Sequence, residues 1–223
     1  MIYIFLMRYR YMRDALRFML ATMSDSLNFE YWCKLNEYIA RNEALEWGKL
    51  RTGSVGISGT DYLPPVPAED QTRAELNAIL SAATTATTKA LEAFVWGTRG
   101  QFFLDGNKRT SMTLANKILI SAGAGFLTIT DRHMEQFNTL LVDYYNTGES
   151  EALKDFLYKN AIQGIFQKAK PPKLLKVVLT SIHLLLLGLY AFFLNQFACR
   201  LAAFISIGCR QPDADTALVD LEP

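Results

Sequence analysis

One ten-residue segment constrains this chain more than any other: Gln-Phe-Phe-Leu-Asp-Gly-Asn-Lys-Arg-Thr, residues 101–110. It is a short polar loop that runs directly into a stretch with helical apolar spacing. The loop carries a carboxylate (Asp105), a flexible glycine (Gly106), an amide (Asn107) and two cations (Lys108 and Arg109). The N-terminus of a helix attracts phosphate, because its first N–H groups have no partner within the helix. The segment therefore predicts a polyphosphate site, with a carboxylate placed to hold the accompanying magnesium ion.

The rest of the chain predicts a mainly α-helical fold. Ser26 is the expected N-cap of a helix that runs to about Leu45. Residues 51–67 are rich in Gly, Ser and Pro, with alternating apolar residues, and predict a small β-hairpin that forms a flap. A short strand is expected over 126–129. Apolar residues recur at helical spacing over five further stretches, 9–23, 69–96, 110–122, 131–145 and 150–161.

The loop resembles the signature loop of the Fic/Doc (Fido) family, His-x-Phe-x-Asp/Glu-Gly-Asn-Gly/Lys-Arg. Gln101 stands where the family carries its catalytic histidine. The resemblance covers roughly residues 51–165 and implies a Fido-type helical domain with a β-hairpin flap. Residues 1–50 would then form helices that precede this core, and residues 166–223 a separate C-terminal segment. The matching residues are Phe103, Asp105, Gly106, Asn107, Lys108 and Arg109.

The resemblance implies transfer of AMP from ATP to a Ser, Thr or Tyr hydroxyl of a target protein. Asp105 would hold Mg²⁺ on the nucleotide, and Gly106 and Asn107 would form the anion hole. Lys108 and Arg109 would complete the nucleotide site, with the arginine on the outer phosphates. Phe103 would be the buried aromatic residue that anchors the loop. The flap would dock a segment of the target by strand addition, through residues Ser58, Gly59 and Thr60.

Three positions differ from the residues of typical AMP-transferring members. A glutamine amide at Gln101 can orient a hydroxyl but cannot take its proton, and a positioned general base is worth about 10²–10⁴ in rate. Transfer would then be slow, or absent in a degenerate nucleotide- or protein-binding regulator. Lys108 is typical of the Doc-like branch, which favours a phosphotransferase as a weaker alternative. Met112 replaces a second arginine of many AMP-transferring members, and His133 is expected at the surface rather than as a relocated base.

The family's self-inhibitory helix carries Ser/Thr-x-x-x-Glu-Gly/Asn, whose glutamate blocks the outer phosphate of the nucleotide. The nearest match ahead of the flap is residues 26–30, but Tyr31 fails the last position. Glu43 or Glu46 could point into the site without matching the motif.

Net charge, cysteine spacing and the N-terminal segment indicate the ligand class and the cellular compartment of the protein. The formal net charge is +1, so no basic surface suggests nucleic acid. Three widely spaced cysteines, Cys33, Cys199 and Cys209, have neither CxxC nor zinc spacing and favour a reducing compartment. Arginines follow the short apolar start instead of preceding it, which is the wrong order for a secretory signal. We therefore expect a cytoplasmic domain, and a homo-oligomer stays open.

Residues 177–199 contain no charged side chain, and a basic linker with four lysines precedes them. A helix of this length would span a bilayer and leave the Fic-like part in the cytoplasm. Two alternatives stay open: a helix packed on the domain, and a segment foreign to it that arises from a shifted reading frame.

Overall fold

The computed structural model describes residues 2–164, with side chains from residue 7 onward. This part of the chain contains seven α-helices and one two-stranded sheet, which confirms the prediction of a mainly α-helical fold. The predicted basic linker and hydrophobic helix lie outside the described residues. Within residues 2–164, no helix combines the length and the hydropathy that crossing a bilayer requires. The elements are α1 (Ile2–Ala21), α2 (Phe29–Ala40), α3 (Glu69–Ser81), α4 (Ala86–Gly100), α5 (Asn107–Ser121), β1 (Phe126–Leu127), α6 (Asp131–Thr147), α7 (Glu151–Asn160) and β2 (Ile162–Gln163).

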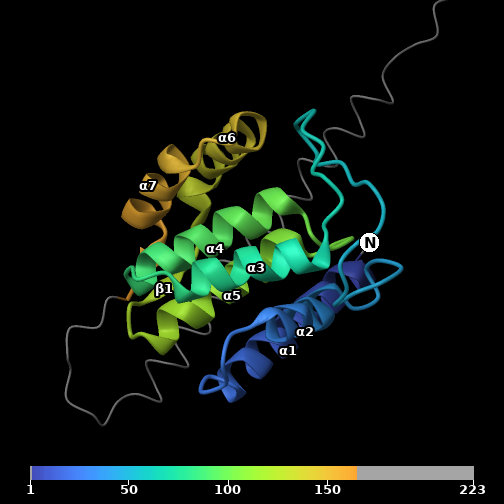
Figure 1. Cartoon of the computed structure of the whole chain (residues 1–223), viewed down its shortest axis with the longest axis horizontal. Coiled ribbons are helices and arrows are strands. Elements are labelled where there is room, and N and C mark those ends of the chain that lie inside the picture. Colours follow the sequence, from blue (N-terminus) through green and yellow to red (C-terminus); the bar gives the residue numbers. More distant parts are fainter. Residues whose placement is uncertain (1, 165–223) are drawn as a thin grey trace, which may run out of the picture.

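Helices α4 and α5 form the centre of the molecule and pack along each other (Figure 1). The pair α1 and α2 covers one side through contacts of both helices with α5, and α6 and α7 cover the other side, where α7 packs on α4. Helix α3 lies beside α4. The connection between α4 and α5 is the loop that the sequence singled out, so it sits between the two most central helices.

The loop is anchored in an aromatic cluster of the core. Trp32 of α2 is 1% exposed, and its ring centroid lies 4.5 Å from that of Phe103 and 5.3 Å from that of Phe102. Phe102 also packs on Trp96 of α4, at 4.4 Å between centroids. Buried aromatic pairs contribute more than their area alone, so this cluster fixes the loop against α2 and α4. The predicted burial of Phe103 is confirmed.

Helix α2 begins and ends at other residues than predicted. Its N-cap is Asn28 instead of Ser26, because the side-chain Oδ1 of Asn28 accepts the Tyr31 N–H at 2.8 Å. The helix ends at Ala40, well before Leu45. There Asn42 adopts a left-handed conformation with φ 59°, which asparagine tolerates better than most residues. The chain therefore turns sharply at this point.

The helix predicted over 69–96 is two helices. Ala82 leaves the helical region with ψ 137° and ends α3. Thr85 then caps α4, since its hydroxyl oxygen accepts the Thr88 N–H at 3.1 Å. Threonine hydroxyls compete with helical backbone bonds in this way, and apolar periodicity alone does not register it.

The prediction of a hairpin over 51–67 is wrong: the structure has no strand in this range, and β1 pairs antiparallel with β2 instead. The buried side chain of Arg51 satisfies the carbonyls that a partner strand would bind. It donates to the oxygens of Gly53 at 2.6 Å, Pro65 at 2.6 Å and Pro64 at 3.2 Å. Prolines have no N–H to offer a strand ladder, so the segment forms a stapled loop.

The other elements agree with their prediction. Residues 126–129 contain β1, and the helices predicted over 110–122, 131–145 and 150–161 are α5, α6 and α7. Helix α1 begins earlier than the predicted residue 9.

Candidate functional site

The loop between α4 and α5 is held by two residues with positive φ. Gln101 ends α4 with φ 44°, and Gly106 is the N-cap of α5 with φ 79°. A Cβ at Gly106 would lie 3.2 Å from atoms of Asn36, Ile39 and Ala40. Glycine is therefore required here both by the backbone conformation and by the close approach of α2. Because the N-cap is a glycine, it contributes no side-chain oxygen of its own to the start of α5.

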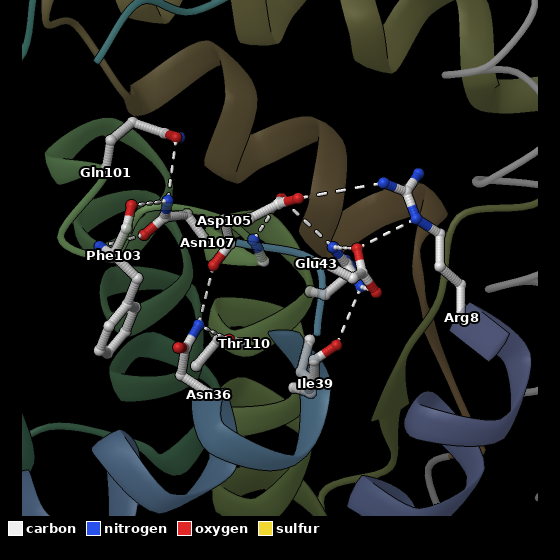
Figure 2. A network of polar contacts seen from close by, with 11 residues as sticks. Arg8, Asn36, Ile39, Glu43, Gln101, Phe103, Asp105, Asn107 and Thr110 are labelled. Atoms are coloured by element: carbon white, nitrogen blue, oxygen red, sulfur yellow. Dashed lines mark hydrogen bonds and ion pairs between the residues drawn. The ribbon is translucent and has the colours of Figure 1, made fainter. Parts of the chain in front are cut away.

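Asn107 organises the loop from inside. Its Oδ1 accepts the Phe103 N–H at 2.9 Å, and its Nδ2 donates to the Phe103 carbonyl at 2.7 Å. The same Nδ2 donates to Oε1 of Gln101 at 3.2 Å. The side chain is 6% exposed and fully committed to these contacts (Figure 2). Any contribution of Asn107 to an anion hole would therefore come from its backbone at the start of α5.

Gln101, which the resemblance aligns with the catalytic histidine of the Fic/Doc family, is also held at both ends of its amide. Its Nε2 donates to the Thr98 carbonyl at 2.6 Å, while its Oε1 accepts from Asn107. Its own carbonyl accepts the Arg51 Nε at 2.5 Å. The amide links the end of α4 to the start of α5, and it offers no group that takes up a proton at neutral pH.

Arg109 and Glu43 form the most buried ion pair of the described residues, with both side chains 6% exposed. The pair is bidentate: Nη1 and Nη2 of Arg109 each lie 2.7 Å from one carboxylate oxygen of Glu43. Nη1 also donates to the Ile39 carbonyl at 3.1 Å. Burial lowers the pKa of the guanidinium, but the hydrogen bonds and charge of Glu43 outweigh burial and raise this pKa above its ordinary value.

Asp105 joins this pair to a second arginine. Its Oδ1 accepts the Gly106 N–H at 2.5 Å and lies 3.3 Å from Nη2 of Arg109. Arg8, from α1, places its Nε 3.0 Å from Oε2 of Glu43 and its Nη2 3.9 Å from Oδ2 of Asp105. Figure 2 shows Arg8 at the opposite end of this network from Gln101. Two carboxylates and two guanidinium groups thus meet at the N-terminus of α5.

The turn after α2 explains how Glu43 reaches this place. The left-handed Asn42 reverses the chain, and the Glu43 N–H then donates to the Ala40 carbonyl at 3.0 Å. The other acidic candidates lie elsewhere. Glu30 pairs with Arg73 at the surface, and Glu46 lies 3.6 Å from Lys49 with half of its side chain exposed. Of the glutamates weighed in the sequence, Glu43 is therefore the one that enters the site.

Asn36 of α2 holds the loop through side-chain hydrogen bonds. This residue was not identified from the sequence. Its Nδ2 donates to the Asp105 carbonyl at 3.0 Å and to the Thr110 hydroxyl at 3.2 Å, and its Oδ1 accepts the Gly48 N–H at 2.8 Å. The residue is fully buried. An amide on the apolar face of an amphipathic helix, between Leu35 and Ile39 in the sequence, was the available signal.

The flap residues lie apart from these contacts. Ser58 and Gly59 are exposed, and the Thr60 hydroxyl donates to Asn146 near the end of α6. A Cβ on Gly59 would lie 3.8 Å from Val142 of the same helix. The tip of the loop therefore rests on α6. Its connection to the site runs through Arg51, which holds the Gln101 carbonyl.

His133 and Lys108 complete the predicted residues. His133 lies in the first turn of α6, with its ring edge against Phe156 and its Nδ1 3.5 Å from the Thr130 hydroxyl. The side chain is partly buried instead of fully at the surface. Lys108 lies in the first turn of α5, next to Arg109.

The residues fit a magnesium ion carried by a polyphosphate better than a metal held by protein alone. No group of three or more His, Cys, Asp and Glu gathers within residues 2–164. Magnesium commonly uses one or two carboxylates and takes its other ligands from phosphates and water. Asp105, with a third of its side chain exposed, can supply such a carboxylate.

The chain matches no protein-family model, and no curated protein matches it significantly.

Proposed function

We propose that the chain is a Fic/Doc-type transferase that binds magnesium–ATP at the N-terminus of α5 and moves AMP to a hydroxyl of a target protein. The observation that carries this proposal is the buried guanidinium of Arg109. Its bidentate partner is a carboxylate from a distant turn, placed beside a glycine N-cap with no side-chain acceptor. An arginine fork and a helix N-terminus that begins with glycine are both suited to phosphate oxygens. Glu43 lies where a phosphate would bind, so nucleotide binding requires its displacement.

The residues of the site would divide the work as follows. Arg109 would bind the outer phosphates, and the first N–H groups of α5 would bind the oxygens next to them. Asp105 would hold the magnesium ion, which supplies charge neutralisation on the departing phosphates. The hydroxyl oxygen of the target would form a bond to the α-phosphorus while the α–β bridging bond breaks and pyrophosphate leaves.

The rate of transfer depends on which group accepts the proton of the target hydroxyl. Gln101 cannot accept it, so it would pass to water, and the reaction would lack the factor of about 10²–10⁴ that a positioned base contributes. A Gln101→His substitution tests this directly. Histidine tolerates the positive φ at this position better than most side chains.

We therefore expect the full-length Gln101→His variant to label protein hydroxyls from ATP labelled at the α-phosphate, at least a hundredfold faster than the wild type. The same variant with Asp105→Ala serves as the matched control and should stay unlabelled. Label from the γ-phosphate alone would instead support the phosphotransferase alternative that Lys108 favours.

A second function, a nucleotide-binding regulator without transferase activity, is favoured by one observation. The Gln101 amide hydrogen-bonds to Thr98 and Asn107, which is typical of a residue that stabilises the loop. Magnesium–ATP binding by the Gln101→His variant, with no label from either phosphate, would select this function over the transferase.

A further inference from the structure

The carboxylate of Glu43 is shared between two arginines from different helices. Oε2 lies 2.7 Å from Nη2 of Arg109 on α5 and 3.0 Å from Nε of Arg8 on α1. Two guanidinium groups therefore contact one carboxylate oxygen. The second acid, Asp105, is also within 3.9 Å of Arg8. Both arginines therefore contact the same carboxylate oxygen beside the N-terminus of α5, and Figure 2 shows Arg8 reaching it from α1.

The Arg8 guanidinium is held in place without being well satisfied. Its Nε is buried and makes no hydrogen bond of good geometry, although the Oε2 of Glu43 is 3.0 Å away. A buried N–H that is not aligned with an acceptor is unfavourable. A tetrahedral phosphate presents its oxygens in three dimensions, whereas a carboxylate presents two in one plane. A phosphate at this place can therefore satisfy Arg8 and Arg109 together.

The charge balance points the same way. Glu43 carries one negative charge, and the outer phosphate of a nucleotide carries more. Helix α5 supplies no further cation one turn beyond Arg109, because that position is Met112, which is 3% exposed and packed in the core. Arg8 is tied to the site by its helix: the Tyr11 hydroxyl on α1 accepts a hydrogen bond from Asn42, in the turn that carries Glu43, at 2.9 Å.

We propose that Arg8 is the second phosphate-binding cation of this site, and that α1 is part of the nucleotide site instead of a separate N-terminal extension. This inference rests on the proposed function, because it names a further residue for the same phosphates. In the absence of nucleotide, Arg8 holds Glu43. With nucleotide bound, the same guanidinium contacts the outer phosphate that replaces the carboxylate.

The test separates these two roles of Arg8 by removing the competing carboxylate first. In full-length Glu43→Gln, Arg8 can act on the ligand but no longer on a Glu43 charge. Calorimetry with magnesium–ATP would compare this variant with Glu43→Gln/Arg8→Ala. The matched control is Glu43→Gln/Arg17→Ala, which removes an exposed arginine from the same helix. Far-UV circular dichroism would verify that each variant is folded.

We expect Arg8→Ala to weaken binding about tenfold to a hundredfold in this background, the range for losing a charge-assisted contact, and Arg17→Ala to leave it unchanged. Arg8→Lys should restore part of the loss, because it keeps the charge without the planar fork. Equal affinity of the Arg8→Ala and Arg17→Ala variants would overturn the role of Arg8 and leave the proposed function standing. Absence of binding in the folded Glu43→Gln protein itself would overturn both.

Discussion

Replacing Glu43 by Gln should destabilise the fold substantially, because it leaves a buried arginine without its bidentate partner. Removing one member of a buried ion pair typically costs about 3–5 kcal/mol. Arg109 keeps the Ile39 carbonyl at 3.1 Å and Asp105 at 3.3 Å, so we expect a somewhat smaller loss than this range, about 2–4 kcal/mol. Since 1 kcal/mol corresponds to about 2–4 °C for a domain of this size, the midpoint of thermal unfolding should fall by roughly 5–15 °C.

The assay is urea and thermal unfolding of the full-length protein, followed by far-UV circular dichroism. The matched control is Glu46→Gln, whose exposed pair with Lys49 should be worth less than about 1 kcal/mol. A double variant, Glu43→Leu with Arg109→Met, should lose less than the sum of the single changes, because no uncompensated charge is left. A Glu43→Gln protein within about 0.5 kcal/mol of wild type would refute the assignment of Glu43 as the counter-ion of Arg109.

Further predictions for three residues concern the frame around the site. Gly106→Ala should destabilise by at least about 1–2 kcal/mol, because φ is +79° and the added Cβ would press on Ile39 and Ala40; urea unfolding measures it. Burial raises the pKa of the Cys33 thiol from 9.0 to about 12. In a variant whose other cysteines are replaced by serine, alkylation of Cys33 at pH 8 should therefore be at least about tenfold slower in the native protein than in the urea-unfolded protein. The stability linked to this thiol is complete below pH 9.0 and should be lost as the pH rises towards about 12. Arg51→Ala should free the 51–67 loop, measured as faster proteolytic cleavage there with the rest of the domain protected.

The parts of the site that are local in sequence were predictable. The loop of residues 101–110 contains its own turn residues, its aromatic anchor and the start of α5, so the pattern of residue types indicates its geometry. Phe103 was expected to be buried, and it is. The phosphate-binding interpretation of Asp105, Gly106 and Arg109 stays a prediction, which the observed geometry supports.

The contacts that close the site come from distant parts of the chain and were not predictable in the same way. Glu43 enters because Asn42 takes a left-handed conformation, and no apolar periodicity reports such a turn. Arg8 lies on α1 and reaches Glu43 only through the packing of α1 against α2 and α5. The hairpin prediction failed for a related reason: a single buried side chain, Arg51, satisfies the loop carbonyls that strands would otherwise pair.

The most direct test is calorimetric titration of magnesium–ATP into full-length Glu43→Gln, beside the same protein with Asp105→Ala. We expect micromolar binding to the first variant and a loss of at least about tenfold in the second, because the carboxylate that holds the magnesium ion is gone. The absence of measurable binding to a folded Glu43→Gln protein, or equal binding by both variants, would contradict a phosphate site at the N-terminus of α5.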